Sequence, residues 1–76
     1  MKERITSETT GKSYCAKDVV RIVNQSQAAM YMAHGAELLD VYVSRDYKTH
    51  WPMMVYIFDR AATTPLYDGW CKRELT

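Results

Sequence analysis

The sequence predicts an α+β fold in which a strand is followed by a helix, two strands and a second helix. The first observation behind this prediction is the apolar run Met-Met-Val-Tyr-Ile-Phe over Met53–Phe58, which is long enough for a strand that is covered on both faces. The second is the alternation of apolar and polar residues over Leu38–Ser44, which is typical of a half-buried strand. The third is a stretch of good helix formers that lies between a capping residue, Asn24, and Gly35.

The chain is short and nearly neutral, which limits the classes of protein to which it can belong. Its 76 residues carry a net charge of +1 and are 47% hydrophobic, so one small domain with a modest core is expected. A non-specific nucleic-acid-binding protein normally has a strongly basic domain, and this balance argues against that class. We divide the chain into a flexible N-terminal arm over residues 1–13, which is polar and lacks apolar periodicity, and a single α+β domain over residues 14–76.

The sequence also favours a cytoplasmic location without a membrane anchor. No stretch approaches the ~20 apolar residues that a membrane span needs, and Met1–Thr10 lacks the apolar core of a signal peptide. The two cysteines, Cys15 and Cys71, are therefore expected to be reduced thiols. The alternative is a disulfide that ties the first strand to the last helix.

The first strand is expected within Tyr14–Val23 and is strongest over Val19–Val23, where β-branched residues dominate. Asn24 ends this strand and begins the first helix, because Asn24 with Gln27 three residues later fits a capping box. Gly35 follows the helix, at the position where a left-handed residue commonly ends one. The predicted buried face of the helix is Ala28, Tyr31 and Met32, and the competing face is Ala29, Met30 and Ala33.

The second and third strands are expected to form a β-hairpin. Over Leu38–Ser44, alternation places Leu39, Val41 and Val43 on one face and Asp40, Tyr42 and Ser44 on the other. The polar segment Arg45–Pro52 forms the turn, and Pro52 is tolerated because it lies at the start of the third strand, Met53–Asp59.

The second helix is predicted from the pair Thr64-Pro65. Thr64 would be the N-cap, and Pro65 would occupy the first helical position, where its missing N–H has no partner to lose. The apolar face of this helix would consist of Leu66, Tyr67, Trp70 and Cys71.

Together these elements predict a three-stranded antiparallel-type sheet with the strand order 1-3-2. The most apolar strand lies in the middle, and both helices pack on one face, as in half of a ferredoxin-like fold that lacks its last strand. The first strand is then an edge, which could pair with the N-terminal arm, a second copy of the chain or a strand of a partner. The face opposite the helices must also be covered, either by the N-terminal arm, if it folds over, or by a second molecule.

No catalytic or metal-binding signature is present in the sequence. The candidate ligands Cys15, His34, His50 and Cys71 have none of the close spacings that zinc sites use. The three glycines are isolated, so no phosphate-binding loop is expected. We therefore predict a protein that is not an enzyme and that has no catalytic residue, metal or cofactor.

Aromatic and basic residues gather in the predicted hairpin turn and on the sheet. Such a mixture is typical of protein-interface hot spots, and it also occurs where aromatic side chains stack on nucleic-acid bases. The remaining alternative is a solvated turn whose Trp51 folds back onto the core. The predicted partner-binding residues are Arg45, Tyr47, Lys48, His50 and Trp51 in the hairpin, with Tyr42 and Tyr56 on a sheet face that we expect to be open.

Five short segments carry a resemblance to a known group of proteins. They are Asn24-Gln25-x-Gln27-Ala28, then Tyr31 and Gly35, then Asp40-Val41-Tyr42, then Val55-Tyr56-Ile57-Phe58-Asp59, and finally Pro65-Leu66-Tyr67-x-x-Trp70. Over roughly Val20 to Leu75 the chain resembles a family of small proteins encoded by bacteriophages, prophages and Firmicutes genomes.

The resemblance implies an origin in a phage or mobile element. Small phage proteins without an enzyme signature are often inhibitors of host machinery, including anti-CRISPR and other anti-defence proteins. The leading hypothesis is therefore a non-enzymatic protein that binds and inhibits a bacterial host protein or complex, with a homodimer as a further expectation. The alternative is a small nucleic-acid-binding regulator that uses the same hairpin.

Overall fold

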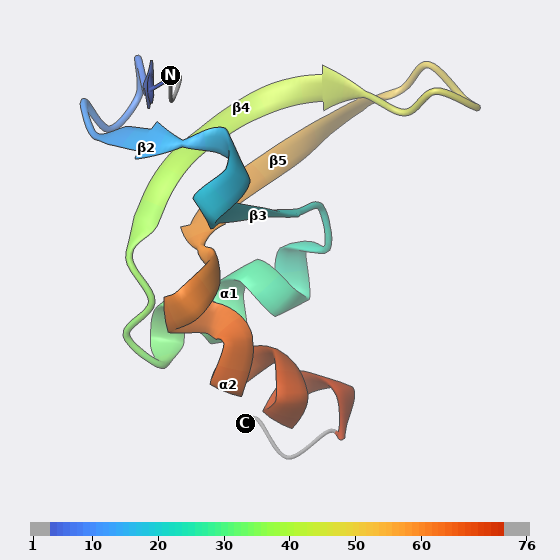
Figure 1. The fold of residues 1–76 in the computed structure, drawn as a ribbon. Helices are drawn as coiled ribbons and strands as arrows, with labels where there is room; N and C mark the ends of the chain where they lie inside the picture. The colour runs from blue at the N-terminus through green and yellow to red at the C-terminus, as the bar shows by residue number, and fades with distance from the viewer. Residues whose placement is uncertain (1–3, 73–76) are drawn as a thin grey trace.

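A computed structural model of the protein describes residues 4–72. Its central sheet has three antiparallel strands in the order β3-β5-β4, and its two helices follow β3 and β5 in the chain (Figure 1). This arrangement confirms the predicted α+β class and the predicted strand order. The elements are β1 (Arg4–Thr6), β2 (Ser13–Cys15), a 3-10 turn η1 (Ala16–Asp18), β3 (Val19–Ile22), α1 (Gln25–Ala33), β4 (Leu38–Arg45), β5 (Pro52–Asp59) and α2 (Arg60–Cys71).

Strand β5 is central because its residues are apolar on both faces. It pairs with β3 through Val20 opposite Phe58, and with β4 through Tyr42 opposite Val55. Phe58 and Val55 point to opposite faces of the sheet, and both are completely buried. The Met53–Phe58 run therefore has the role that its composition predicts.

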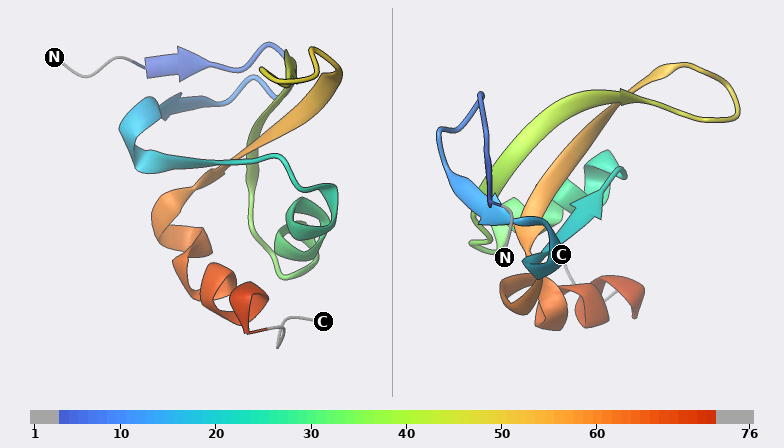
Figure 2. Two further views of the ribbon diagram at one scale, coloured as in Figure 1. Left: turned by 90° about the vertical axis from the view of Figure 1, so that its right-hand side faces the viewer. Right: turned by 45° about the horizontal axis from the view of Figure 1, so that its top comes forward.

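Both helices cover one face of the sheet, as Figures 1 and 2 show. The core on this side contains Ile22, Ala28, Tyr31 and Phe58, and Leu66 and Trp70 of α2 pack against it. The rings of Tyr31 and Phe58 meet edge to face, with their centroids 5.5 Å apart. This geometry is favourable for aromatic rings and adds to the hydrophobic stabilisation of the core.

The opposite face is covered by the N-terminal part of the chain, which is one of the two covers that the sequence left open. Residues 4–13 of the predicted flexible arm form part of a β-hairpin, and residues 1–3 lie outside the described residues. β1 and β2 form an antiparallel hairpin, in which Ile5 pairs with Tyr14. Tyr14 packs with Val19, Val55 and Ile57 in a second core cluster. The sheet face that was expected to be open is therefore occupied by a segment of the chain itself.

Helix α1 begins and ends where the sequence predicts. The Asn24 side chain accepts a hydrogen bond from the Gln27 N–H at 3.0 Å, and Gly35 adopts a φ of +91° after the helix. The N–H groups of Gly35 and Ala36 then bond back to the carbonyls of Met32 and Tyr31, which closes a Schellman motif. Ala28 and Tyr31 are buried as predicted, but Met32 is 40% exposed and does not belong to the buried face.

Helix α2 begins five residues earlier than predicted. Its N-cap is Asp59, whose carboxylate accepts a hydrogen bond from the Ala62 N–H at 3.0 Å. Pro65 therefore lies inside the helix, and Thr64 donates its hydroxyl to the Arg60 carbonyl instead of capping the helix. On the predicted apolar face, Leu66 and Trp70 pack on the core, whereas Tyr67 and Cys71 are exposed.

At two positions of β4, the burial of the side chain is the opposite of what the alternation of apolar and polar residues predicts. Asp40 is buried, and Val43 is 63% exposed. The register also places Tyr42 opposite Val55 and Val41 opposite Tyr56, so Tyr42 and Tyr56 lie on opposite faces of the sheet. The expectation that these two tyrosines share a face was wrong. Cys15 and Cys71 are free thiols, as predicted.

Candidate protein-binding site

The distal end of the β4–β5 hairpin projects beyond the helices and the N-terminal hairpin (Figures 1 and 2). Its turn presents two large aromatic side chains, Tyr47 with 82% of its surface exposed and Trp51 with 73%. Single exposed apolar side chains are ordinary, but two aromatic rings at one projecting turn are less so. Trp51 does not fold back onto the core, which was the alternative for this segment.

The turn is held by the side chain and the backbone of Asp46. One carboxylate oxygen of Asp46 accepts hydrogen bonds from the N–H groups of Lys48, at 2.7 Å, and Thr49, at 3.1 Å. Its backbone carbonyl accepts from the His50 N–H at 2.7 Å, and its N–H donates to the Trp51 carbonyl at 3.0 Å. The bonds from Thr49 and Lys48 lower the pKa of the Asp46 carboxyl below its ordinary value. The turn therefore has one preferred conformation around an ionised Asp46.

His50 completes the turn in a left-handed conformation, with a φ of +62°. This region is unfavourable for most residues that carry a Cβ atom. The Arg45 guanidinium donates to the His50 carbonyl at 2.8 Å and so bridges the two ends of the turn. Arg45 and His50 thus support the positions of Tyr47 and Trp51.

The exposed charged side chains at the tip are mostly positive. The Lys48 ammonium lies 5.8 Å from the centre of the Tyr47 ring, within the range of a cation–π contact. The Asp46 carboxylate is turned toward backbone N–H groups, whereas Arg45 and Lys48 are exposed. The tip therefore combines two aromatic surfaces with two cations.

The structure brings five of the seven predicted binding residues together and separates the other two. Tyr42 lies in the stem of the hairpin, on the face that β2 covers nearer the body. Tyr56 packs against the core beneath the helices. Val43, which alternation placed in the core, is instead an exposed residue of the stem. The five residues at the tip are Arg45, Tyr47, Lys48, His50 and Trp51.

A buried polar cluster lies on the other side of the sheet, where the N-terminal hairpin meets β4. The Asp40 carboxylate accepts hydrogen bonds from the Ser7 hydroxyl at 2.6 Å, the Tyr14 hydroxyl at 2.7 Å and the Val41 N–H at 2.8 Å. Sequence patterns missed this cluster because Ser7 and Asp40 are 33 residues apart. The sequence signal was an aspartate that lies between Leu39 and Val41 in β4.

These contacts change how readily Asp40 and Tyr14 ionise. Burial by itself raises the pKa of the Asp40 carboxyl, but the hydrogen bonds from Ser7, Tyr14 and Val41 outweigh it and leave that pKa below its ordinary value. Burial, together with the hydrogen bond to Asp40 and its charge, raises the pKa of Tyr14 to about 12. Asp40 is therefore ionised and Tyr14 neutral at pH 7, which is the combination that the hydrogen bond requires.

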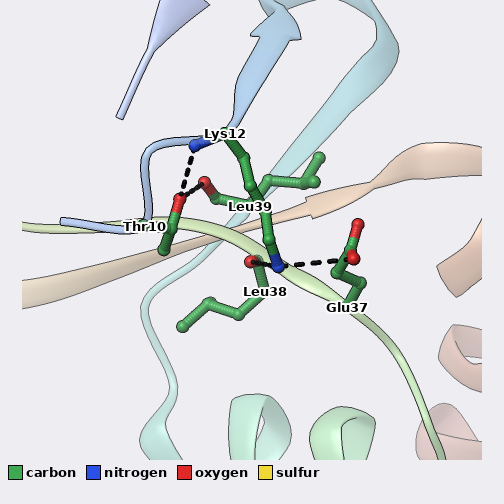
Figure 3. A network of polar contacts seen from close by, with 5 residues as sticks. All are labelled: Thr10, Lys12, Glu37, Leu38 and Leu39. Atoms are coloured by element: carbon green, nitrogen blue, oxygen red, sulfur yellow. Dashed lines mark hydrogen bonds and ion pairs between the residues drawn. The ribbon is translucent and has the colours of Figure 1, made fainter. Parts of the chain in front are cut away.

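The loop between β1 and β2 also binds the outer edge of β4. Thr9 donates to the Val41 carbonyl at 3.2 Å, and Thr10 donates to the Leu39 carbonyl at 2.7 Å. Lys12 donates to the Leu38 carbonyl at 3.2 Å and forms an ion pair with Glu37 at 3.3 Å (Figure 3). These side chains occupy carbonyls that a further strand would use, so this part of the β4 edge is closed.

A surface cavity of about 730 Å³ lies beside this cluster and extends along the stem of the hairpin, with Tyr14, Asp40, Tyr42, Val43 and Met54 in its lining. The Asp40 carboxylate at its inner end already has three donors. The Asp40 carboxylate therefore holds the N-terminal hairpin, and we assign no chemistry to the cavity.

Comparisons with known proteins give no relative: no protein-family description matches the chain, and neither the curated proteins nor the solved structures contain a significant match. Within residues 4–72, no three His, Cys, Asp or Glu side chains are grouped so that they could hold a metal ion. Neither helix in the described part of the chain has the length and apolar character that a membrane crossing requires.

Proposed function

We propose that the protein is a non-enzymatic binding protein that uses the tip of the β4–β5 hairpin to bind and inhibit a bacterial host protein. The observation that carries the proposal is the exposure of Tyr47 and Trp51 on a turn fixed by Asp46. Tyr, Trp and Arg are the residues that most often dominate binding energy at protein interfaces. Because the turn is already ordered, little conformational entropy is lost when it binds.

The nature of the partner rests on the resemblance to phage and prophage proteins. A phage protein that acts by binding would meet its target in the cytoplasm of the infected cell, and a defence system is the target class that we favour. Inhibition would follow from occupying a surface that the host protein needs. The partner surface would be concave and acidic, so that it accepts two aromatic rings flanked by Arg45 and Lys48.

The same tip supports a second candidate, a nucleic-acid-binding regulator. Bases could stack on Tyr47 and Trp51 while Arg45 and Lys48 contact phosphates. This candidate requires affinity for DNA or RNA that falls steeply as salt increases. Weak binding without a salt dependence would exclude it.

The proposal is tested in bacterial strains that each carry one defence system. Expression of the wild-type chain should restore plaque formation by a restricted phage in at least one strain, by about tenfold or more. The double variant Tyr47→Ala/Trp51→Ala should lose this effect, because truncation of two interface aromatics commonly weakens binding by about 100-fold or more.

The matched control is Met32→Ala, which removes an exposed apolar side chain from α1, away from the hairpin. It should restore plaques as the wild type does. Affinity purification with mass spectrometry should recover the same host protein with the wild type and with Met32→Ala, but not with the double variant. Equal activity of the double variant, or no restored plaques in any strain, would refute the proposal.

A further inference from the structure

Strand β3 has a free edge. It pairs with β5 on one side, and the sheet ends there. Since the N-terminal hairpin binds the β4 edge and covers one face, it does not occupy the edge of β3. No strand among residues 4–72 therefore pairs with the outer edge of β3. The sequence left three possible occupants for this edge: the N-terminal arm, a second copy or a partner strand.

The register of the sheet identifies which backbone groups point outward along this edge. In antiparallel strands, alternate residues turn their N–H and C=O groups toward the same neighbour. The Asp46 N–H bonds to the Trp51 carbonyl, which places the odd-numbered residues of β5 toward β4 and the even-numbered ones toward β3. Val20 and Ile22 consequently bond to β5, and the backbone groups of Val19 and Arg21 face outward.

A contact on the same edge supports this assignment. The Arg60 guanidinium donates to the Val19 carbonyl at 3.0 Å, which requires that carbonyl to point away from β5. No hydrogen bond within residues 4–72 reaches the outward groups of Arg21, the next residue of this kind. Arg21 itself is exposed. The unpaired edge is thus centred on Arg21.

A groove runs beside this edge, between β3 and the two helices. Its volume is about 400 Å³. An edge strand next to a helix is the arrangement in which extended peptides add to a sheet, with backbone hydrogen bonds giving affinity and side-chain pockets giving specificity. Its lining consists of Val20, Arg21, Ile22, Tyr31, Arg60, Thr63, Thr64 and Tyr67.

The charge of the groove indicates which peptide it would accept. Among the described residues, the charged ones in its lining are Arg21 and Arg60. Neither has a carboxylate partner within residues 4–72, since Arg60 bonds to a backbone carbonyl. The hydroxyls of Tyr67 and Thr64 add polar groups to the same lining. This surface is complementary to an acidic segment.

We propose that the edge of β3 and the adjoining groove bind an extended acidic peptide of a partner, which adds to the sheet as a fourth strand antiparallel or parallel to β3 and places carboxylates against Arg21 and Arg60. This site is separate from the hairpin tip, and it does not depend on the function proposed for that tip. The two surfaces lie on different edges of the molecule, so a partner could engage either one alone.

The test uses the full chain labelled with nitrogen-15 and three hexapeptides, followed by amide NMR. The first peptide alternates Glu and Val, the second alternates Lys and Val, and the third is the Glu–Val peptide with every backbone nitrogen methylated. The Glu–Val peptide should shift the amide of Arg21 and its neighbours in a saturable way. It should bind about tenfold or more tightly than the Lys–Val peptide.

The methylated peptide keeps the charges but cannot donate backbone hydrogen bonds, so strand addition predicts that its binding is lost. Arg21→Glu should weaken the Glu–Val peptide about tenfold or more, whereas Arg45→Glu at the hairpin tip should leave it unchanged. Equal binding of the methylated peptide would mean charge attraction alone and would overturn the proposal. Shifts that map to the tip or to β4, or no saturable shifts, would overturn it as well.

Discussion

The Asp40 carboxylate joins two parts of the molecule that are distant in sequence. It accepts hydrogen bonds from Ser7 in the loop of the N-terminal hairpin and from Tyr14 in β2. Hydrogen bonds to a charged group contribute about 1.5–3 kcal/mol each, and the loss of the acceptor leaves buried donors unpaired. The attachment of the N-terminal hairpin to β4 therefore depends strongly on this single residue.

We expect Asp40→Asn to lower the free energy of unfolding by about 1–3 kcal/mol at pH 7, because a neutral amide accepts these bonds less strongly. The folded-state pKa of Asp40 lies below its ordinary value of 3.8. A depressed pKa contributes stability above the unfolded-state pKa, and that contribution is lost as pH falls through the folded-state pKa. The difference between the wild type and the variant should therefore shrink below about pH 4. Urea unfolding at pH 7 and pH 3 measures it.

Asp68→Asn is the matched control for this experiment. Asp68 is exposed, and among residues 4–72 it forms one ion pair, with Lys72 on the surface of α2, at 3.2 Å. Exposed ion pairs contribute about 0–1 kcal/mol, so this variant should differ little from the wild type. An Asp40→Asn protein as stable as Asp68→Asn at pH 7 would show that the cluster does not hold the hairpin.

At the scale of elements, sequence patterns succeed where the signal is local. Asn24 and Gly35 bound α1 correctly, because a cap acts on groups within one turn of it. Patterns fail where a residue is placed by distant contacts. Asp40 is buried only because Ser7 and Tyr14 reach it, and Val43 is exposed only because the hairpin extends past the core.

The position of the hairpin tip could be predicted from the local sequence, whereas the register between the strands could not. The sequence was enough to predict that Tyr47, Lys48 and Trp51 lie in one turn, because a short segment between two paired strands must form the hairpin turn. Whether Tyr42 and Tyr56 share a face depends on a register that neither strand specifies by itself. A shift of one residue between paired strands would reverse the answer.

Helix α2 has two start signals that compete, Asp59 and the pair Thr64-Pro65. The structure uses Asp59, so Pro65 lies in the helix interior and the Ala61 carbonyl has no N–H four residues later to accept from. The hydroxyls of Thr63 and Thr64 donate to the carbonyls of Asp59 and Arg60 in the same turn. This turn is therefore a weak point of the helix.

We expect Pro65→Ala to raise the free energy of unfolding by about 1–3 kcal/mol, because alanine restores the missing hydrogen bond and removes the ring clash. The side chain of Pro65 is exposed, so little packing is lost. Had the helix begun at Thr64, the proline would be at the first position and the substitution would be neutral or destabilising. Urea unfolding distinguishes these outcomes. Asp59→Ala is the companion variant, and it should lose about 1 kcal/mol of stability because it removes the cap.

At the scale of the whole molecule, β5 is sandwiched between two covers. The helices protect the face of Phe58, and the N-terminal hairpin protects the face of Val55 and Ile57. Each fully buried apolar side chain contributes about 1.5–3 kcal/mol, while the net stability of a domain is only about 5–15 kcal/mol. In a chain of 76 residues, neither cover is dispensable.

Deletion of residues 1–15 should therefore abolish the stable monomer. It exposes Val55 and Ile57, removes Tyr14, and leaves the Asp40 carboxylate without its two side-chain donors. We expect the truncated chain to lose its cooperative thermal transition by circular dichroism and to self-associate through the bared face by light scattering. If the chain without residues 1–15 stays monomeric and melts cooperatively within a few degrees of the wild type, the three-stranded sheet and its helices are a complete domain by themselves, and the hairpin is an accessory.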